Sequence, residues 1–276
     1  MPIKTSEDIL EETPMTDIET LIVERHEHVA EIVLNRPEQR NALNAAMCDA
    51  LRTAAIVLRD DNSIHCIIVR ANGPVFCAGA DLKERKGMSV DDVRARRLKA
   101  FAAYDALEKI GKPCIALVEG AAVGSGGEIA MACDFIVATD NANFRTPEAL
   151  WGTVGATQRL PRIVGKRLAK DMAYTGRTLS AKEAQQVGLV SRIVDANDAL
   201  NAVRQMASEI ASAPPLAMRL TRDCIDRGVE TDPAGALAIE MLAIDTLLQT
   251  SDWKQSISTF GQGSNTSIQS RENGHA

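Results

Sequence analysis

The sequence predicts an α/β core built from recurring units of two strands and one helix, followed by a helical C-terminal region. Short, continuous apolar runs, namely IHCIIVRA, CIALVEG and DFIVATD, are typical of strands buried inside a core. Segments with helical spacing separate these runs, and the alternation continues to LVSRIV, residues 189–194. After residue 197 the segments have helical character only, which marks the change of region.

The first elements follow a polar stretch, residues 1–16, that we expect to be disordered. Residues 20–34 predict two short strands, TLIVER and HVAEIVLN. Leu43, Met47, Leu51 and Leu58 then recur at helical spacing. The sequence from Ser89 to Asp92 has the form of a capping box, so a long helix is predicted from there to about residue 110.

The C-terminal region contains three predicted helices. The last, DPAGALAIEMLAIDTLLQTSD, is apolar around much of its circumference, so it needs a partner surface such as another subunit. A polar tail, which we expect to be disordered, ends the chain. The predicted organisation is therefore a tail at 1–16, an α/β core at 17–196, a helical region at 197–263 and a second tail at 264–276.

Composition excludes several classes of protein. The net charge of -6 over 276 residues argues against a nucleic-acid-binding role, which usually needs a basic excess. No apolar run is long enough to span a membrane, and the N-terminus lacks the features of a secretory signal. The six cysteines form no CxxC pair, and the four histidines have no metal-like spacing with them. We expect a cytoplasmic protein with free thiols and no metal site.

The glycine-rich stretch AAVGSGGEIAMACD, residues 121–134, raises a functional question. It is not a dinucleotide fingerprint, because Ile129 stands where a third glycine is needed. It is not a hydrolase elbow, because Val123 replaces the first glycine of that motif, and the chain has no phosphate-binding P-loop. Taken alone, the stretch is more typical of a tight turn, with Glu128 exposed in the first turn of a helix.

Two other stretches favour a catalytic interpretation. A glycine run lets a ligand approach the backbone, and the first N–H groups of the following helix are free to stabilise a negative oxygen. PVFCAGADLKE, residues 74–84, offers a second free N–H at its turn, and ANFRTPEALWG, residues 142–152, brings a second carboxylate, Glu148. The chain thus has two candidate backbone donors and two candidate carboxylates.

Six stretches occur in one order along residues 20–195, namely NRPEQRNALN, FCAGADLKE, EGAAVGSGGEIAMACD, NFRTPE, ATQRLPRIVG and TGRTLSAKEAQQVGLV. Together they resemble the crotonase family, the enoyl-CoA hydratases and isomerases. The resemblance implies a crotonase-like spiral of strand-strand-helix turns, with C-terminal helices that assemble trimers or dimers of trimers. It also implies an acyl-CoA thioester substrate, with coenzyme A as part of the substrate and no further cofactor.

The resemblance assigns roles to individual residues. The backbone N–H groups of Ala80 and Ser125 form an oxyanion hole for the thioester oxygen. Glu128 is the base that activates water, and Glu148 is the acid that protonates Cα. The positions implied in substrate or CoA binding are Arg40, Ala42, Ala78, Gly79, Asp81, Leu82, Lys83, Gly124 and Trp151. The charges of Arg40 and Lys83 are equally compatible with ordinary solvated side chains.

The chain departs from the family pattern in three places. Ser125 replaces a frequent glycine, the loop GTVGATQR after Glu148 is short, and the C-terminus lacks basic residues that often touch CoA. The presence of both glutamates favours an enoyl-CoA hydratase. The alternatives are an isomerase or another acyl-CoA lyase or hydrolase of the family, and, less favoured, an RNA-binding role through RARRLK, which as a helical segment suits a solvated face better. The acyl group is left open, with Leu150, Trp151 and the helix around residues 85–105 expected to line its pocket.

Overall fold

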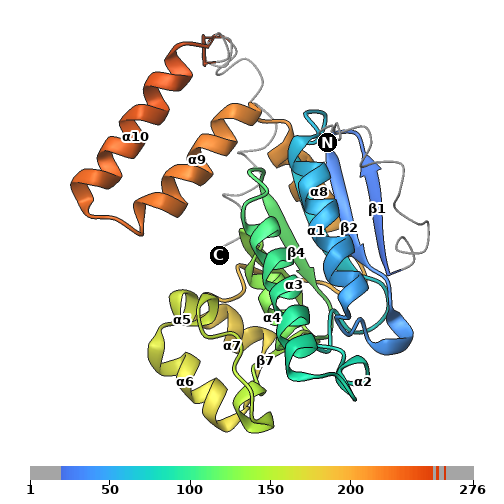
Figure 1. Ribbon diagram of the computed structural model, residues 1–276. Coiled ribbons are helices and arrows are strands. Elements are labelled where there is room, and N and C mark those ends of the chain that lie inside the picture. Colours follow the sequence, from blue (N-terminus) through green and yellow to red (C-terminus); the bar gives the residue numbers. More distant parts are fainter. Residues whose placement is uncertain (1–19, 251–252, 255–257, 259–276) are drawn as a thin grey trace, which may run out of the picture. The chain divides into compact units, whose positions relative to one another are not determined.

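The computed structural model describes residues 20–250, 253, 254 and 258 (Figure 1). The predicted tails at 1–16 and 264–276 lie outside the described residues. The chain divides into two compact units, one ending at Ser212 and the other beginning at Ala213. Among the described helices, none is long and apolar enough to cross a membrane.

The main sheet of the first unit has six strands in the order β1-β2-β3-β4-β6-β9. Their bounds are Leu21–His26, Val29–Leu34, Cys66–Ala71, Cys114–Val118, Phe135–Thr139 and Arg192–Val194. β1 and β2 form an antiparallel hairpin, and every later pair in the sheet is parallel. The apolar runs predicted as buried strands are β3, β4 and β6, which the structure confirms.

Both faces of the central part of this sheet are buried, which explains why β3, β4 and β6 are mostly apolar along their length. Because side chains alternate along a strand, Ile67 and Val69 of β3 enter one core cluster while Cys66 and Ile68 enter another on the opposite face. Helices α1 (Ala45–Asp60) and α3 (Val90–Glu108) pack side by side and contribute to the first cluster (Figure 1). Helix α8 (Ala199–Ala211) contributes to the second.

Helix α3 begins where the capping box predicts. The Ser89 side chain accepts from the Asp92 N–H, and the Asp92 side chain accepts from the Ser89 N–H. This reciprocal cap satisfies two donors that the first turn of a helix would otherwise leave free. The helix ends at Glu108, close to the predicted end.

A smaller sheet, which the sequence did not reveal, holds the region around residue 124. Its strands are β5 (Ala121–Val123), β7 (Asn143–Arg145) and β8 (Thr178–Ser180), in the order β5-β7-β8. Short helices complete the unit: α2 (Leu82–Arg85), α4 (Ser125–Met131), α5 (Arg159–Val164), α6 (Lys166–Thr175) and α7 (Ala181–Gln186). Two 3-10 turns, η2 (Pro37–Gln39) and η3 (Glu148–Trp151), lie in the loops.

The boundary between the units falls later than the sequence suggests. Residue 197 begins the helical region in sequence, but α8 is fixed to the main sheet because Val203, Ala207 and Ala211 are buried against it. The second unit contains α9 (Pro215–Gly228) and α10 (Pro233–Leu248), which pack on each other as a helical hairpin (Figure 1).

Helix α10 keeps many apolar side chains exposed within the single chain. Those on it with at least two-fifths of their area exposed are Leu237, Met241, Leu242, Ile244 and Leu248. Such a density of exposed large apolar groups on one helix is typical of an interaction surface.

Candidate active site

A cavity of about 450 Å³ lies within the first unit. Its walls come from the loop before α2, one face of α3, the β5–α4 turn, and η3 with the loop that follows it. The α3 residues on this wall recur at helical spacing: Val93, Arg96, Arg97, Ala100, Phe101 and Tyr104. The predicted site residues that line the cavity are Arg40, Ala78, Gly79, Ala80, Leu82, Gly124, Ser125, Glu128, Glu148 and Trp151.

The backbone of Ala80 is oriented by a parallel bridge to Leu43. The Leu43 N–H donates to Gly79 O at 2.8 Å, and the Asp81 N–H donates to Leu43 O at 2.9 Å. In a parallel bridge, the residue between these two bonds directs its own N–H away from the neighbouring strand. The Ala80 N–H is therefore free, with no acceptor in the described part of the chain.

The second backbone donor comes from the turn that joins β5 to α4. Gly124 has a φ of 51°, a conformation that favours glycine, and Ser125 is the first residue of α4. The Ser125 N–H has no acceptor among the described residues, as expected at the start of a helix. A Cβ on Gly126 would lie 2.4 Å from Cys77 O, so this glycine lets α4 approach the chain that leads to Ala80. The cavity thus presents two free N–H groups on neighbouring walls.

Glu128 lies within α4 rather than at its start, because the helix begins at Ser125. Its residue is only 8% exposed. Arg159 Nη1 donates to its Oε2 at 2.8 Å, which gives the buried carboxylate a charged partner. A buried carboxylate is costly unless it is paired in this way.

Glu148 is held between two glycines. A Cβ on Gly124 would lie 2.6 Å from Glu148 Oε1, and a Cβ on Gly155 would lie 2.8 Å from the same atom. Glu148 Oε2 is buried and has no hydrogen-bond partner among the described residues. Burial raises the pKa of Glu148 above its usual value, and the nearby charge of Glu128 adds to the rise. This carboxyl therefore retains its proton at a higher pH than an exposed one does.

The raised pKa of Glu148 has a consequence for stability. The folded state holds this proton more tightly than the unfolded state, so stability is lost as pH rises through the folded-state pKa. We expect Glu148→Gln to be more stable than the wild type at neutral pH, because glutamine avoids both the cost of burying a charge and the cost of holding a proton that the unfolded chain would release. The gain should vanish below the usual carboxyl pKa of about 4.3. Thermal melts across this pH range measure it, each kcal/mol raising the melting temperature by about 2–4 °C.

Glu209→Gln on α8 is the matched control for that experiment, because Glu209 is exposed. Its melting temperature should follow that of the wild type at every pH. A Glu148→Gln variant that is less stable than the wild type at neutral pH would show that the buried Glu148 carboxyl does not destabilise the folded state.

Three predicted binding residues do not line the cavity: Ala42, Asp81 and Lys83. Asp81 caps α2 by accepting from the N–H groups of Lys83 and Glu84, and it pairs with Arg36 Nη1 at 3.0 Å. Arg36 also donates to Ala42 O. These contacts give Ala42 and Asp81 a role in shaping the loop beside Ala80, whereas Lys83 is exposed.

Two arginines shape the site although the sequence did not indicate it: Arg159 had no individual role, and Arg97 belongs to RARRLK, which was expected to form a solvated face. Arg159 pairs with Glu128, and its motif, ATQRLPRIVG, was noted only as part of the family pattern. Arg97 donates from Nη2 to Thr153 Oγ1 at 2.8 Å and also to Val154 O, so it fixes the short loop that carries Gly155. The signal available in the sequence was the place of Arg97 on the helix predicted to line the pocket.

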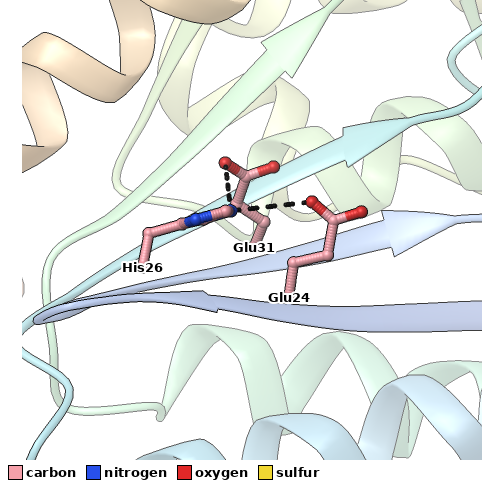
Figure 2. Close-up of side chains that lie close together, drawn as sticks. All are labelled: Glu24, His26 and Glu31. Atoms are coloured by element: carbon pink, nitrogen blue, oxygen red, sulfur yellow. Dashed lines mark ion pairs between the residues drawn. The ribbon is translucent and has the colours of Figure 1, made fainter.

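A separate polar cluster on β1 and β2 contains Glu24, His26 and Glu31, whose potential ligand atoms lie within 4.8 Å of one another (Figure 2). Two arginines pair with the Glu31 carboxylate of this cluster. Arg70 Nε donates to Glu31 Oε2 at 2.5 Å, and Arg204 Nε donates to Glu31 Oε1 at 2.5 Å. Burial would raise the pKa of Glu31, but the hydrogen bonds from Arg204 and Arg70 outweigh it and lower that pKa. Two guanidinium groups already supply the positive charge, so the cluster is an ion-pair network that ties α8 to the sheet.

Comparisons with known proteins identify the family. Residues 24–266 match the family described as Enoyl-CoA hydratase/isomerase. The chain is 38% identical over 238 residues to "Probable enoyl-CoA hydratase 2, mitochondrial" of Arabidopsis thaliana, covering 85% of this chain and 79% of the relative. It is 34% identical over 248 residues to "Short-chain-enoyl-CoA hydratase" of Clostridium acetobutylicum, covering 88% and 95%.

A solved structure agrees with this result. The crystal structure of enoyl-CoA hydratase from Bacillus anthracis is similar with a TM-score of 0.86 at 33% identity, covering 88% of this chain and 96% of that one. The chain therefore belongs to the enoyl-CoA hydratase/isomerase family and has the α/β crotonase fold with two sheets and C-terminal helices. The predicted fold class is confirmed, and the protein is a crotonase-family enzyme. Its cytoplasmic location stays a prediction, since the Arabidopsis relative is named as mitochondrial.

Proposed function

We propose that this protein is an enoyl-CoA hydratase, which adds water across the α,β double bond of an acyl-CoA thioester. The observation that carries the proposal is the presence of two differently treated carboxyl groups on one cavity. Glu128 has an arginine partner, whereas Glu148 has a buried, unpartnered oxygen and a raised pKa. Two carboxyls with contrasting environments suit a base and an acid working on one substrate.

The two carboxyl groups divide the proton transfers of the proposed hydration between them. Glu128 takes a proton from water as the water oxygen forms a bond to Cβ. The π electrons of the double bond move toward the thioester carbonyl, whose oxygen becomes negative. The N–H groups of Ala80 and Ser125 stabilise that oxygen, and each such donor is worth about 2.7–4 kcal/mol. Glu148 then gives its proton to Cα, and solvent restores the two carboxyls to their starting states.

An isomerase is the principal alternative within the family. Moving a double bond needs proton transfer at carbon but no activated water, so one carboxyl near Cα is sufficient. Glu128 lines the same cavity as Glu148, and Arg159 holds it there. A second carboxyl is therefore available to activate water, which favours hydration.

The proposed substrate is an enoyl-CoA thioester, and residues on the cavity wall are candidates for contacting its parts. Arg40 on the cavity wall is a candidate for contacting CoA phosphates, and the exposed apolar side chains of Phe101 and Trp151 are candidates for the acyl chain or the pantetheine arm. A screen of enoyl-CoA thioesters with different acyl groups, followed by loss of the conjugated-thioester absorbance, tests the proposal. Absence of turnover on every thioester in the screen would contradict it.

We also propose that α10 joins subunits into a trimer or a dimer of trimers. Its exposed side chains, such as Leu237 at 60% and Leu242 at 67%, would gain from burial against another copy. Light scattering on the purified chain should give a mass of at least three subunits. A stable monomer at micromolar concentration would contradict this assembly.

A further inference from the structure

The two oxygens of the Glu128 carboxylate have different surroundings. Arg159 Nη1 donates to Oε2 at 2.8 Å, whereas no donor in the described part of the chain reaches Oε1. Glu128 also lines the cavity. One oxygen is therefore fixed by an arginine, and the other is left to accept a proton.

Arg159 is itself held by two further contacts. Its Nη2 donates to Glu108 Oε2 at 2.5 Å, at the last residue of α3. Its guanidinium carbon lies 5.8 Å from the centre of the Tyr104 ring, and its side chain is only 19% exposed. Arg159 is the first residue of α5. Through its bonds to Glu108 of α3 and Glu128 of α4, its guanidinium links three helices. A planar guanidinium fixed in this way restrains the direction of its carboxylate partner.

We propose that Arg159 is a positioning residue for water activation: it fixes Oε2 of Glu128 so that Oε1 is directed at the water that attacks Cβ. Glu148 has no arginine partner of this kind among the described residues, so of the two only Glu128 has one of its oxygens fixed by a guanidinium. The inference rests on the proposed hydratase function.

The test separates water addition from proton transfer at Cα. Hydration of a short enoyl-CoA needs Glu128, whereas exchange of the α-protons of butyryl-CoA in deuterium oxide needs only Glu148 and the oxyanion hole. Arg159→Gln should lower kcat for hydration by about 10- to 10²-fold, less than the 10²–10⁴-fold of a whole proton transfer, because the base is left in place but is no longer oriented. KM and the exchange rate should stay within about threefold, because neither depends on an activated water. Arg159→Lys keeps the positive charge but lacks the planar set of guanidinium donors, so it should hydrate faster than Arg159→Gln and more slowly than the wild type.

Two further variants make the test specific. The double variant Arg159→Gln/Glu128→Gln should be no slower than Glu128→Gln alone, because both changes act through one carboxylate. Arg167→Gln, on exposed surface of α6, is the matched control and should behave as the wild type. Additive losses in the double variant, or a parallel fall of hydration and exchange in Arg159→Gln, would overturn the positioning role.

The outcomes also separate this inference from the proposed function. Normal hydration by Glu128→Gln would refute the hydratase mechanism itself. Loss of hydration in Glu128→Gln with normal hydration in Arg159→Gln would refute only the role of Arg159. If Arg159→Gln does not fold, the Arg159→Lys variant provides the test. Its hydration rate should fall while its rate of α-proton exchange is kept, and equal losses of both rates would refute the proposal.

Discussion

Glu128→Gln is expected to lose hydration by about 10²-fold or more, while exchange of the α-protons of butyryl-CoA continues. Glutamine keeps the size of the side chain and can still contact Arg159 through its amide oxygen, but it cannot accept a proton from water. Glu148, Ala80 and Ser125 are unchanged, so under the proposed mechanism the reaction at Cα retains its acid–base group and its oxyanion donors.

The rates of hydration and exchange, measured on the same preparations, check this expectation. Glu209→Gln is the matched control and should show wild-type values for both rates. An isomerase that relies on Glu148 alone would behave differently, because Glu128→Gln would leave double-bond migration nearly intact. Wild-type hydration by Glu128→Gln would refute the role assigned to this carboxylate.

Glu148→Gln is expected to abolish both reactions, with a loss of about 10²–10⁴-fold in each. Hydration needs a proton for Cα, and exchange needs the same group to remove one. Glutamine fits between Gly124 and Gly155 without a change in size, so the loss reports chemistry rather than packing.

The melting temperature of the same variant provides an internal control. It should be higher than that of the wild type at neutral pH, because the buried ionisable group is gone. An inactive but more stable protein would show that Glu148 is kept for function at a cost in stability. Retained exchange in Glu148→Gln would require a different base at Cα.

The parts of the fold that the sequence predicted are those with a local physical signature. The capping box at Ser89 begins α3 because its two hydrogen bonds involve residues only three positions apart. The strands β3, β4 and β6 could be recognised because burial on both faces requires continuous apolar runs. The α10 helix was evident for a similar reason, since its apolar residues extend around the circumference.

The parts that were missed depend on contacts between distant residues. The strands of the small sheet have three residues each, which is too short for any periodicity to appear. The start of α4 at Ser125 has no local signal, because a glycine run has a low intrinsic helix propensity and the close approach of Gly126 to Cys77 O depends on tertiary structure.

In the candidate site, too, the residues within recognisable motifs could be predicted and the contacts between distant residues could not. The two glutamates and the two backbone donors could be placed from motifs, and the structure brings all four residues to one cavity. The pairing of Arg159 with Glu128 spans 31 residues, and nothing local in the sequence indicates it. The resemblance to the family implied a binding role for Asp81, whereas the structure shows it as the cap of α2, outside the lining of the cavity.

The central claim, that this enzyme adds water to an enoyl thioester, is tested most directly by following atoms from labelled water. The wild-type protein is incubated with a short 2-enoyl-CoA in water that carries heavy oxygen and deuterium, and the product is analysed by mass spectrometry and NMR. The predicted product is a 3-hydroxyacyl-CoA with one heavy oxygen at Cβ and one deuterium at Cα. A product with a shifted double bond and no heavy oxygen would contradict the claim and identify the reaction as isomerisation.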